Sequence, residues 1–420
     1  MSLNPDEAKN IDTIVAIGEA FHRLGVNSFR LESALSELSR KLGVKAQFFF
    51  TPTIIISTFS TSDGEIGRHV RIDSSETNLE KLCLVDEAAN QFSEGKVSPE
   101  NTLKLLAQIQ KAPSRYSDRL MLLCFAIGPA TVAGLISSRP VDMLASFFIG
   151  LGVGFIDLFA AKVKGMEQLK EALAAIFATF LGIAMKLLYP SINLEVVILS
   201  GLIKLLPGLS LTMAMAELAM NHLASGTARF MGSLMTLLKI TFGVALAQRI
   251  SFALLGPDFF KIRAQEISQL TDSYLSLQGP LPVWYKVPIL LVSTLTFAVV
   301  YKARPKDTFW VILSGVWGDL ATRAGGLWLG TEFGSFIGGL AVGALSNFLA
   351  RVMGRPVTLF LLPGIILTVP GSFGYRSFLT LFSKNFETGM GEAVTAMSIA
   401  VGLVAGLFFG NILINPRRNL

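Results

Sequence analysis

The sequence predicts an α-helical polytopic membrane protein, with about ten transmembrane helices in two five-span repeats and a small N-terminal α+β cytoplasmic domain. Three observations support this fold class. Of the 420 residues, 51% are hydrophobic and 16% are charged, whereas a soluble domain carries about 25% charged residues. Nearly all long apolar runs follow Arg119. The octapeptide LLPGLSLT at Leu205–Thr212 returns as LLPGIILT at Leu361–Thr368, which indicates an internal duplication.

The first 118 residues mix charged and apolar positions and predict a domain with both helices and strands. Ser98 and Pro99 suit the N-cap and first position of a helix, and β-branched and aromatic runs predict strands. The expected helices lie within 12–42, interrupted near Gly25, and at Leu79–Phe92 and Pro99–Gln110; the expected strands are Lys45–Phe50, Thr53–Phe59 and Ile66–Ile72. Met1–Asn10 is polar, so we expect no signal peptide and a domain that stays in the cytosol.

The apolar remainder of the chain divides into ten segments that can enter a bilayer, which takes about 20 mostly apolar residues each. They are Leu120–Ser138, Met143–Ala161, Ala172–Leu188, Leu194–Met215, Phe230–Ala247, Trp284–Tyr301, Thr308–Ala321, Leu327–Leu349, Val357–Phe373 and Ala393–Ile414. The seventh is short and can extend past Arg323. The predicted domains are the cytoplasmic domain at 1–118, a first five-span repeat at 119–250, an extracytoplasmic loop at 251–283 and a second five-span repeat at 284–420.

The loop between the two repeats is the one long polar insert, Ser251–Pro282. Its apolar residues recur at helical spacing, at Ile262, Ile267, Leu270, Tyr274 and Leu277. This pattern predicts an amphipathic helix on the membrane surface.

The distribution of basic residues favours a cytoplasmic N-terminus. With the N-terminus inside, the inside flanks of the spans carry fourteen Lys and Arg residues and the outside flanks nine, as the positive-inside rule requires. Ten spans then return the C-terminus to the cytosol. The motif Arg139-Pro140-Val141-Asp142 before the second span is echoed by Arg304-Pro305-Lys306-Asp307 before the seventh. Because five is odd, the two repeats should enter the membrane from opposite sides, which predicts an inverted repeat.

The duplicated Pro-Gly pairs predict breaks inside the fourth and ninth spans, because Pro lacks an N–H group and Gly is flexible. A broken helix frees backbone groups that a polar substrate or an ion can satisfy. The candidate substrate-binding residues are Pro207, Gly208, Thr212, Glu217, Pro363, Gly364 and Thr368. A second pair, Pro370-Gly371, lengthens the later irregular stretch. The alternative is that both pairs are structural kinks without ligand contact.

Ionisable residues within spans are the candidates for ion coupling. Asp157 ends the second span and Asp319 lies in the seventh, the equivalent span of the other repeat. Either carries a coupling proton if buried, or is solvated at the interface. Lys204, three residues before Pro207, either meets a substrate carboxylate or extends to the interface.

Other classes of function find little support in the sequence. None of the three histidines stands in a metalloprotease or nucleophile–base pattern, and no phosphate-binding glycine loop opens the N-terminal domain. We therefore predict no enzyme activity, cofactor or metal site. Cys83 and Cys124 read as buried apolar residues. The basic residues cluster beside the apolar segments, which favours membrane orientation over nucleic-acid binding.

The N-terminal domain and the second repeat resemble a known family. The residues that carry the resemblance are Gly18, Gly25, Arg30-Leu31-Glu32, Gly43, Thr51-Pro52-Thr53, Arg68, Arg71, Leu79 and Ala112-Pro113-Ser114-Arg115-Tyr116, together with LLPGIILTVPG at Leu361–Gly371. They are similar to the two modules of the threonine/serine exporter family. The resemblance implies ten spans, a cytoplasmic N-terminal domain and export of small hydroxy-amino acids coupled to an ion gradient.

These observations lead to one functional hypothesis and two alternatives. The hypothesis is a secondary active transporter in the plasma (cytoplasmic) membrane that exports small polar amino acids by alternating access. Its expected partners are the amino-acid substrate, a coupling ion (proton or sodium) and the lipid bilayer, with a homo-oligomer left open. The alternatives are a membrane-anchored sensor or scaffold whose soluble domain carries the activity, and a channel for small polar solutes.

Overall fold

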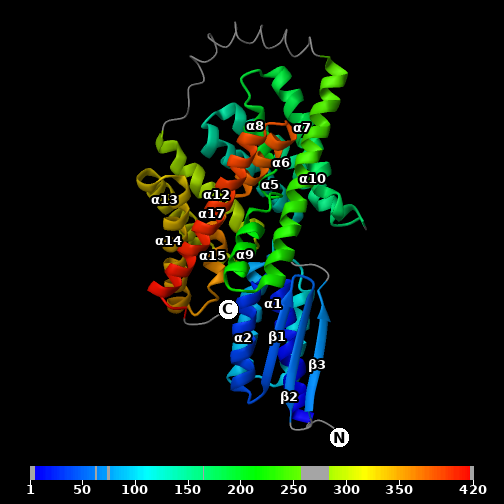
Figure 1. The fold of residues 1–420 in the computed structure, drawn as a ribbon. Coiled ribbons are helices and arrows are strands. Elements are labelled where there is room, and N and C mark those ends of the chain that lie inside the picture. The colour runs from blue at the N-terminus through cyan, green and yellow to red at the C-terminus, as the bar shows by residue number, and fades with distance from the viewer. Residues whose placement is uncertain (1–4, 62–63, 73–75, 164, 257–282, 417–420) are drawn as a thin grey trace.

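The structure, a computed structural model, describes residues 5–61, 64–72, 76–163, 165–256 and 283–416 (Figure 1). The N-terminal α+β domain, for which we keep the name soluble domain, lies at one end of a bundle of apolar helices. Its elements are α1 (Pro5–Arg23), α2 (Ser28–Lys41), β1 (Lys45–Thr51), β2 (Ile54–Thr61), β3 (Gly64–Arg71), α3 (Leu79–Ser93) and α4 (Pro99–Lys111). All the elements expected in this region are present. Gly25 ends α1 at a φ of +78°, and the Ser98 hydroxyl caps α4 by accepting from the N–H of Asn101.

The three strands form an antiparallel sheet in the order β1-β2-β3. Alternation places one set of side chains inward, so that Phe50 and Ile55, which face each other across β1 and β2, are both 2% exposed. The inward set packs on α1, α2 and α3. His22 of α1 is buried with them, and this burial lowers the pKa of its imidazole even though a ring nitrogen bonds the Thr51 carbonyl.

The apolar part of the chain contains two series of helices in the same order. The first is α5 (Asp118–Ser137), α6 (Pro140–Ala160), α7 (Lys170–Leu188), α8 (Leu194–Gly201), α9 (Gly208–Ala219) and α10 (Leu223–Leu255), with the short η1 (Met166–Gln168) before α7. The second, after η2 (Val283–Tyr285), is α12 (Lys286–Val300), α13 (Pro305–Leu329), α14 (Thr331–Met353), α15 (Thr358–Ile365), α16 (Gly371–Phe382) and α17 (Phe386–Leu413). In each series the fourth predicted span is two short helices.

Six of the described helices, α5, α6, α7, α10, α14 and α17, are long and apolar enough to cross a membrane. α9 and α12 are shorter apolar helices. At the seventh predicted span the helix extends past Arg323, because α13 continues to Leu329, although α13 is not among these six. α10 also runs further than predicted, to Leu255, so the loop begins later. The amphipathic helix predicted within Ser251–Pro282 falls mostly in 257–282, outside the described residues.

Equivalent helices of the two halves make equivalent contacts. α6 packs on α8 as α13 packs on α15, and α7 packs on α10 as α14 packs on α17. The duplicated Arg-Pro motifs begin α6 and α13, with Pro140 and Pro305 in the first helical turn. The second half-helices pack mainly within their own halves, α9 on α10 and α16 on α17, and each also contacts the other half, α9 through α17 and α16 through α10.

Close helix contacts in the second half depend on glycines. A Cβ atom on Gly406 of α17 would lie 2.1 Å from the Phe336 carbonyl oxygen of α14, and one on Gly339 of α14 would lie 2.2 Å from the Leu403 carbonyl oxygen. Small residues at four-residue spacing let membrane helices approach in this way.

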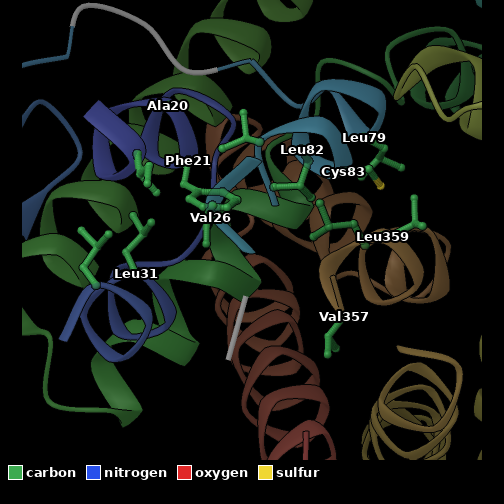
Figure 2. Close-up of a cluster of buried hydrophobic side chains, with 14 of the residues drawn as sticks. Ala20, Phe21, Val26, Leu31, Leu79, Leu82, Cys83, Val357 and Leu359 are labelled. Carbon is green, nitrogen blue, oxygen red and sulfur yellow. The ribbon is translucent and has the colours of Figure 1, made fainter. Parts of the chain in front are cut away.

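The hydrophobic core of the soluble domain continues into the second half. Figure 2 shows Leu79, Leu82 and Cys83 of α3 beside Leu359 near the start of α15. These residues belong to one buried cluster, whereas the buried residues of α6, α7, α8 and α10 form a separate one. The soluble domain is therefore joined by apolar packing chiefly to the second half.

Candidate functional site

Two broken helices meet near the middle of the molecule. α8 ends at Gly201 and α9 begins at Gly208, while α15 ends at Ile365 and α16 begins at Gly371. A Cβ atom on Gly208 would lie 2.9 Å from the Gly371 nitrogen, and one on Gly371 would lie 3.0 Å from the Gly208 Cα. The two backbones are in contact at a point where only glycine fits.

Prolines set the starts of both second half-helices. Pro207 is the N-cap of α9 and Pro370 is the N-cap of α16. The first helical bonds run from the Leu211 N–H to the Pro207 carbonyl, at 2.8 Å, and from the Gly374 N–H to the Pro370 carbonyl, at 3.0 Å. The N–H groups in the first turn of each helix have no intrahelical partner, and each helix N-terminus carries a partial positive charge. Two such termini converge here.

A cavity of about 450 Å³ lies against this junction. This volume falls within the range of about 300–1,000 Å³ typical of small-molecule sites. Its wall includes Pro207 and Gly208 from the first break and Val369 and Gly371 from the second, with apolar side chains between them. The polar and charged side chains on the wall are Thr77, Lys204, Ser210, Arg229, Tyr301, Asp319, Arg323 and Ser372. Basic groups thus outnumber acidic ones on the wall.

Lys204 lies in the first break and connects the cavity to Asp157. Its ammonium group is 3.3 Å from the Asp157 Oδ2 atom and 3.4 Å from the centre of the Phe125 ring, a cation–π contact. Asp157 also lies 3.5 Å from the Lys170 ammonium group. Asp157 is therefore a shared counter-ion of two lysines beside the cavity.

Asp319 lies on the cavity wall itself, near the middle of α13. Its side chain is 9% exposed, and the Arg323 Nε–H donates to it at 2.6 Å, one helical turn away. Both predicted coupling carboxylates are thus present close to the cavity and each is held by a basic partner.

Some of the predicted binding residues line the cavity and others lie in the helices and breaks around it. Pro207 and Gly208 line the cavity, and the Thr212 hydroxyl donates to the Gly208 carbonyl at 3.1 Å. Thr368 lies within the second break, where its hydroxyl donates to the Ile365 carbonyl. Pro363 and Gly364 lie in the last turn of α15, which ends at Ile365, so the break predicted in the ninth span begins directly after this pair.

The partner of Pro207-Gly208 in space is therefore Pro370-Gly371, seven positions after the sequence repeat. Pro363 is tolerated because α15 ends two residues later. In the same turn the Ser314 hydroxyl of α13 donates to the Phe360 carbonyl at 2.7 Å. The Pro-Gly pairs at the starts of α9 and α16 are each followed within two residues by a serine on the cavity wall, Ser210 and Ser372. This shared Pro-Gly and serine pattern could have identified the pair from sequence.

Glu217 is fully buried at the end of α9 and is not among the described residues that line the cavity. Its carboxylate accepts from Ser28 of α2 and from Ser225 and Arg229 of α10. Its predicted role in substrate binding stays a prediction. Sequence reasoning missed Arg229, Arg323 and Tyr301, which lie on helices distant in the chain and meet only through tertiary packing.

Comparisons with known proteins agree with this architecture. A family model of the threonine/serine exporters, ThrE, matches residues 12–251, and a second model, described as threonine/serine exporter, ThrE, matches residues 286–413. No solved structure matches the chain.

Similar proteins occur in yeasts. A protein of Schizosaccharomyces pombe described as uncharacterised is 22% identical over 87% of this chain and 44% of its own length. Pheromone-regulated membrane protein 10 is 24% identical in Candida albicans and 23% identical in Saccharomyces cerevisiae, over 96% of this chain and 38% and 54% of those proteins. The chain thus spans about half the length of these relatives or less. Because the two exporter models together match both the soluble domain and the membrane part, the chain belongs to the threonine/serine exporter family.

Proposed function

We propose that the protein is a secondary active transporter that exports small polar amino acids of the threonine/serine type by alternating access, driven by an ion gradient. The observation that carries the proposal is the meeting of the Gly208 and Gly371 helix N-termini at the wall of the central cavity. Broken helices at the interface of two repeats are the usual substrate site of such carriers.

The chemistry of the cavity suits an amino acid. The substrate carboxylate would lie at the N-termini of α9 and α16, where free N–H groups and the two helix dipoles favour an anion. The substrate ammonium group would meet carbonyls of the two breaks around Pro207 and Thr368, with Asp319 as a second partner. The Ser210 and Ser372 hydroxyls on the wall can bond a hydroxyl on the substrate.

Ion coupling would use the two carboxylates beside the cavity. Asp157 and Asp319 are each held by basic groups, so a proton or sodium ion that binds one of them would release Lys204 or Arg323. The released cation could then attract the substrate carboxylate. Ion binding and substrate binding would thereby be linked through a shared partner.

The proposed topology is ten spans in two inverted repeats, in the cytoplasmic membrane with both termini in the cytosol. α9 and α15 lie at the end nearest the soluble domain, whereas α8 lies toward the opposite end (Figure 1). The two broken helices therefore run in opposite directions, which supports the inversion. Reporters inserted at Gln265 and fused to Leu420, both outside the described residues, should report opposite sides of the membrane; the same side for both would contradict the inversion.

Amino-acid efflux tests the proposal. Cells that express the protein are loaded with a threonine-containing dipeptide, and threonine efflux is followed with and without an uncoupler and with and without sodium. We expect protein-dependent efflux that collapses when one of the two gradients is removed. Efflux that follows only the threonine gradient would indicate a channel, and no protein-dependent efflux of any small amino acid would indicate a scaffold.

A further inference from the structure

The soluble domain forms part of the cavity wall. Gly25, in the turn between α1 and α2, and Thr77, just before α3, both line the cavity. Arg229 of α10 lines it as well. The end of the cavity nearest the soluble domain is therefore bounded by a separate domain rather than by membrane helices alone.

The soluble domain is held firmly to the second half. The Leu79 and Glu80 N–H groups, at the start of α3, donate to the Tyr301 and Lys302 carbonyls that follow α12, at 2.9 and 3.0 Å. The Tyr116 hydroxyl donates to the Ala303 carbonyl at 2.6 Å. The continuous apolar cluster of α3 and α15 adds to these bonds (Figure 2).

Glu87 adds an ionic contact on the same side. Its carboxylate bonds both Arg304, at the start of α13, and Arg355, after α14. Backbone bonds, apolar packing and ion pairs thus all join the soluble domain to helices of the second half.

The contact with the first half, where β1 and α2 lie against α9 and α10, has a buried polar group within it. The Ser28 N–H and hydroxyl donate to Glu217 Oε1 at 3.0 and 3.1 Å, and the Ser28 and Ser225 hydroxyl oxygens are 2.7 Å apart. Arg229 binds the same carboxylate through two nitrogens, at 3.1 and 3.2 Å. We call Ser28, Glu217, Ser225 and Arg229 the latch. Phe29 of α2 packs beside it, against His222 of the first half and Phe408 of α17 in the second half.

The latch also caps the N-terminus of α2. Asn27, the N-cap of α2, makes no side-chain cap bond, and the Glu217 carboxylate from α9 serves the first N–H group of the helix instead. An acidic group at a helix N-terminus is stabilised by the helix dipole. Water can replace polar bonds of this kind, whereas it cannot replace the apolar packing on the other side.

We propose that the soluble domain is a gate of the cavity, carried by the second half and opened by release of the Ser28–Glu217 latch. When the latch opens, the α2 end of the soluble domain moves away from α9 and α10 and uncovers the cavity beside Gly25 and Arg229. Glu217 and Arg229 both belong to the first half, so their ion pair stays together and stands at the open entrance. This inference rests on the proposed transport function and adds the element that controls access.

A disulfide across the latch tests the gate. In Ser28→Cys/Ser225→Cys the two sulfur atoms replace hydroxyl oxygens that are already in contact, and a disulfide needs about 2.05 Å between sulfurs. Both native cysteines are buried, and burial raises the pKa of the Cys83 thiol to about 12, which keeps it unreactive. The full-length protein in membrane vesicles also carries Ser210→Cys, a probe on the cavity wall. A membrane-impermeant maleimide is then added on the side of the soluble domain.

Oxidation should slow labelling of the probe by about tenfold or more, a change of about 1.4 kcal/mol in the cost of opening, and a reductant should restore it. The single variants Ser28→Cys and Ser225→Cys, each with the probe, should not respond to oxidation. Unchanged labelling in the oxidised double variant, with the disulfide verified on a gel, would overturn the gate.

A milder variant tests the same step without a crosslink. Ser28→Ala removes one donor to Glu217 and should speed labelling of the probe. Ser33→Ala should not change it, because the Ser33 hydroxyl lies on the exposed face of α2 and donates to the Phe29 carbonyl of its own helix. Equal rates in the two variants would contradict the latch. Labelling reports the gate independently of transport, so a protein that gates its cavity but moves no amino acid would disprove the proposed function alone.

Discussion

At the scale of single residues, the sequence located one side of the junction better than the other. Pro207-Gly208 could be singled out because a Pro-Gly pair in an apolar segment opposes a continuous helix. Its spatial partner was missed, because the repeat aligned Gly208 with Gly364. The distinction between Gly364 and Gly371 depends on where α15 ends, and α15 packs on α13, from which Ser314 donates to the Phe360 carbonyl. Sequence identity does not report such tertiary contacts.

Small side chains added at the junction should separate the two half-helices. In Gly208→Ala the new Cβ would meet Val369 Cγ2 at 2.7 Å and the Gly371 backbone at 2.9 Å. Overpacking of this kind costs about 1–3 kcal/mol, so we expect Gly208→Ala and Gly371→Ala each to reduce threonine efflux by about tenfold, at 1.4 kcal/mol per tenfold.

The matched control is Gly232→Ala. Gly232 lies in α10 with open space where a Cβ would stand, so efflux should stay at the level of the unsubstituted protein. Unimpaired efflux in both junction variants, at equal amounts of protein in the membrane, would remove the junction from the site.

At the scale of secondary-structure elements, local signals were sufficient to predict the helices and strands of the soluble domain. The cap at Ser98, the break at Gly25 and the alternating strands are all set by neighbouring residues, and each was found where predicted. Boundaries in the membrane part were less certain, because hydrophobicity marks the apolar stretch and not the helix. α10 therefore has 33 residues although its predicted span was much shorter.

Packing of α17 on α14 should depend on glycine at one position. In Gly406→Ala the Cβ would lie 2.1 Å from the Phe336 carbonyl oxygen and 2.7 Å from the Leu340 nitrogen, both backbone atoms that cannot move aside. Alanine otherwise favours a helix by about 1 kcal/mol relative to glycine. We expect the steric cost to exceed this gain and to lower the thermal unfolding temperature of the detergent-purified protein.

Gly391→Ala in the same helix serves as the reference. No atom lies within 4 Å of a Cβ at Gly391, so this variant should match or exceed the original stability. The opposite order of the two unfolding temperatures would show that the α14–α17 contact is not limited by backbone approach.

At the scale of the whole molecule, the duplication could be predicted because both halves keep the same order of elements and the same Arg-Pro motifs. The contacts that the soluble domain makes with the two halves could not be predicted. Its contacts join Ser28 to Glu217 and Glu87 to Arg304, pairs that are distant in the sequence and follow no period. Arg229 and Arg323 on the cavity wall were missed for the same reason, whereas Lys204 and Asp319 had been candidates.

The contacts of the half-helices across the two halves have a consequence for how the protein is made. α9 rests partly on α17 and α16 rests partly on α10, so each half covers part of the other. Tyr375 of α16, 1% exposed, is buried within the apolar cluster of the first half. A half produced alone would leave such surfaces exposed within the bilayer and should be recognised as an orphan subunit.

A chain divided between residues 256 and 283 should therefore accumulate only when both fragments are produced in the same cell. We expect the fragments to copurify through a tag on one of them, and each fragment alone to be degraded. Stable accumulation of either fragment alone would contradict this interdependence. Although its family matches it as two modules, the protein would then be a single assembly unit, an obligate heterodimer joined into one chain.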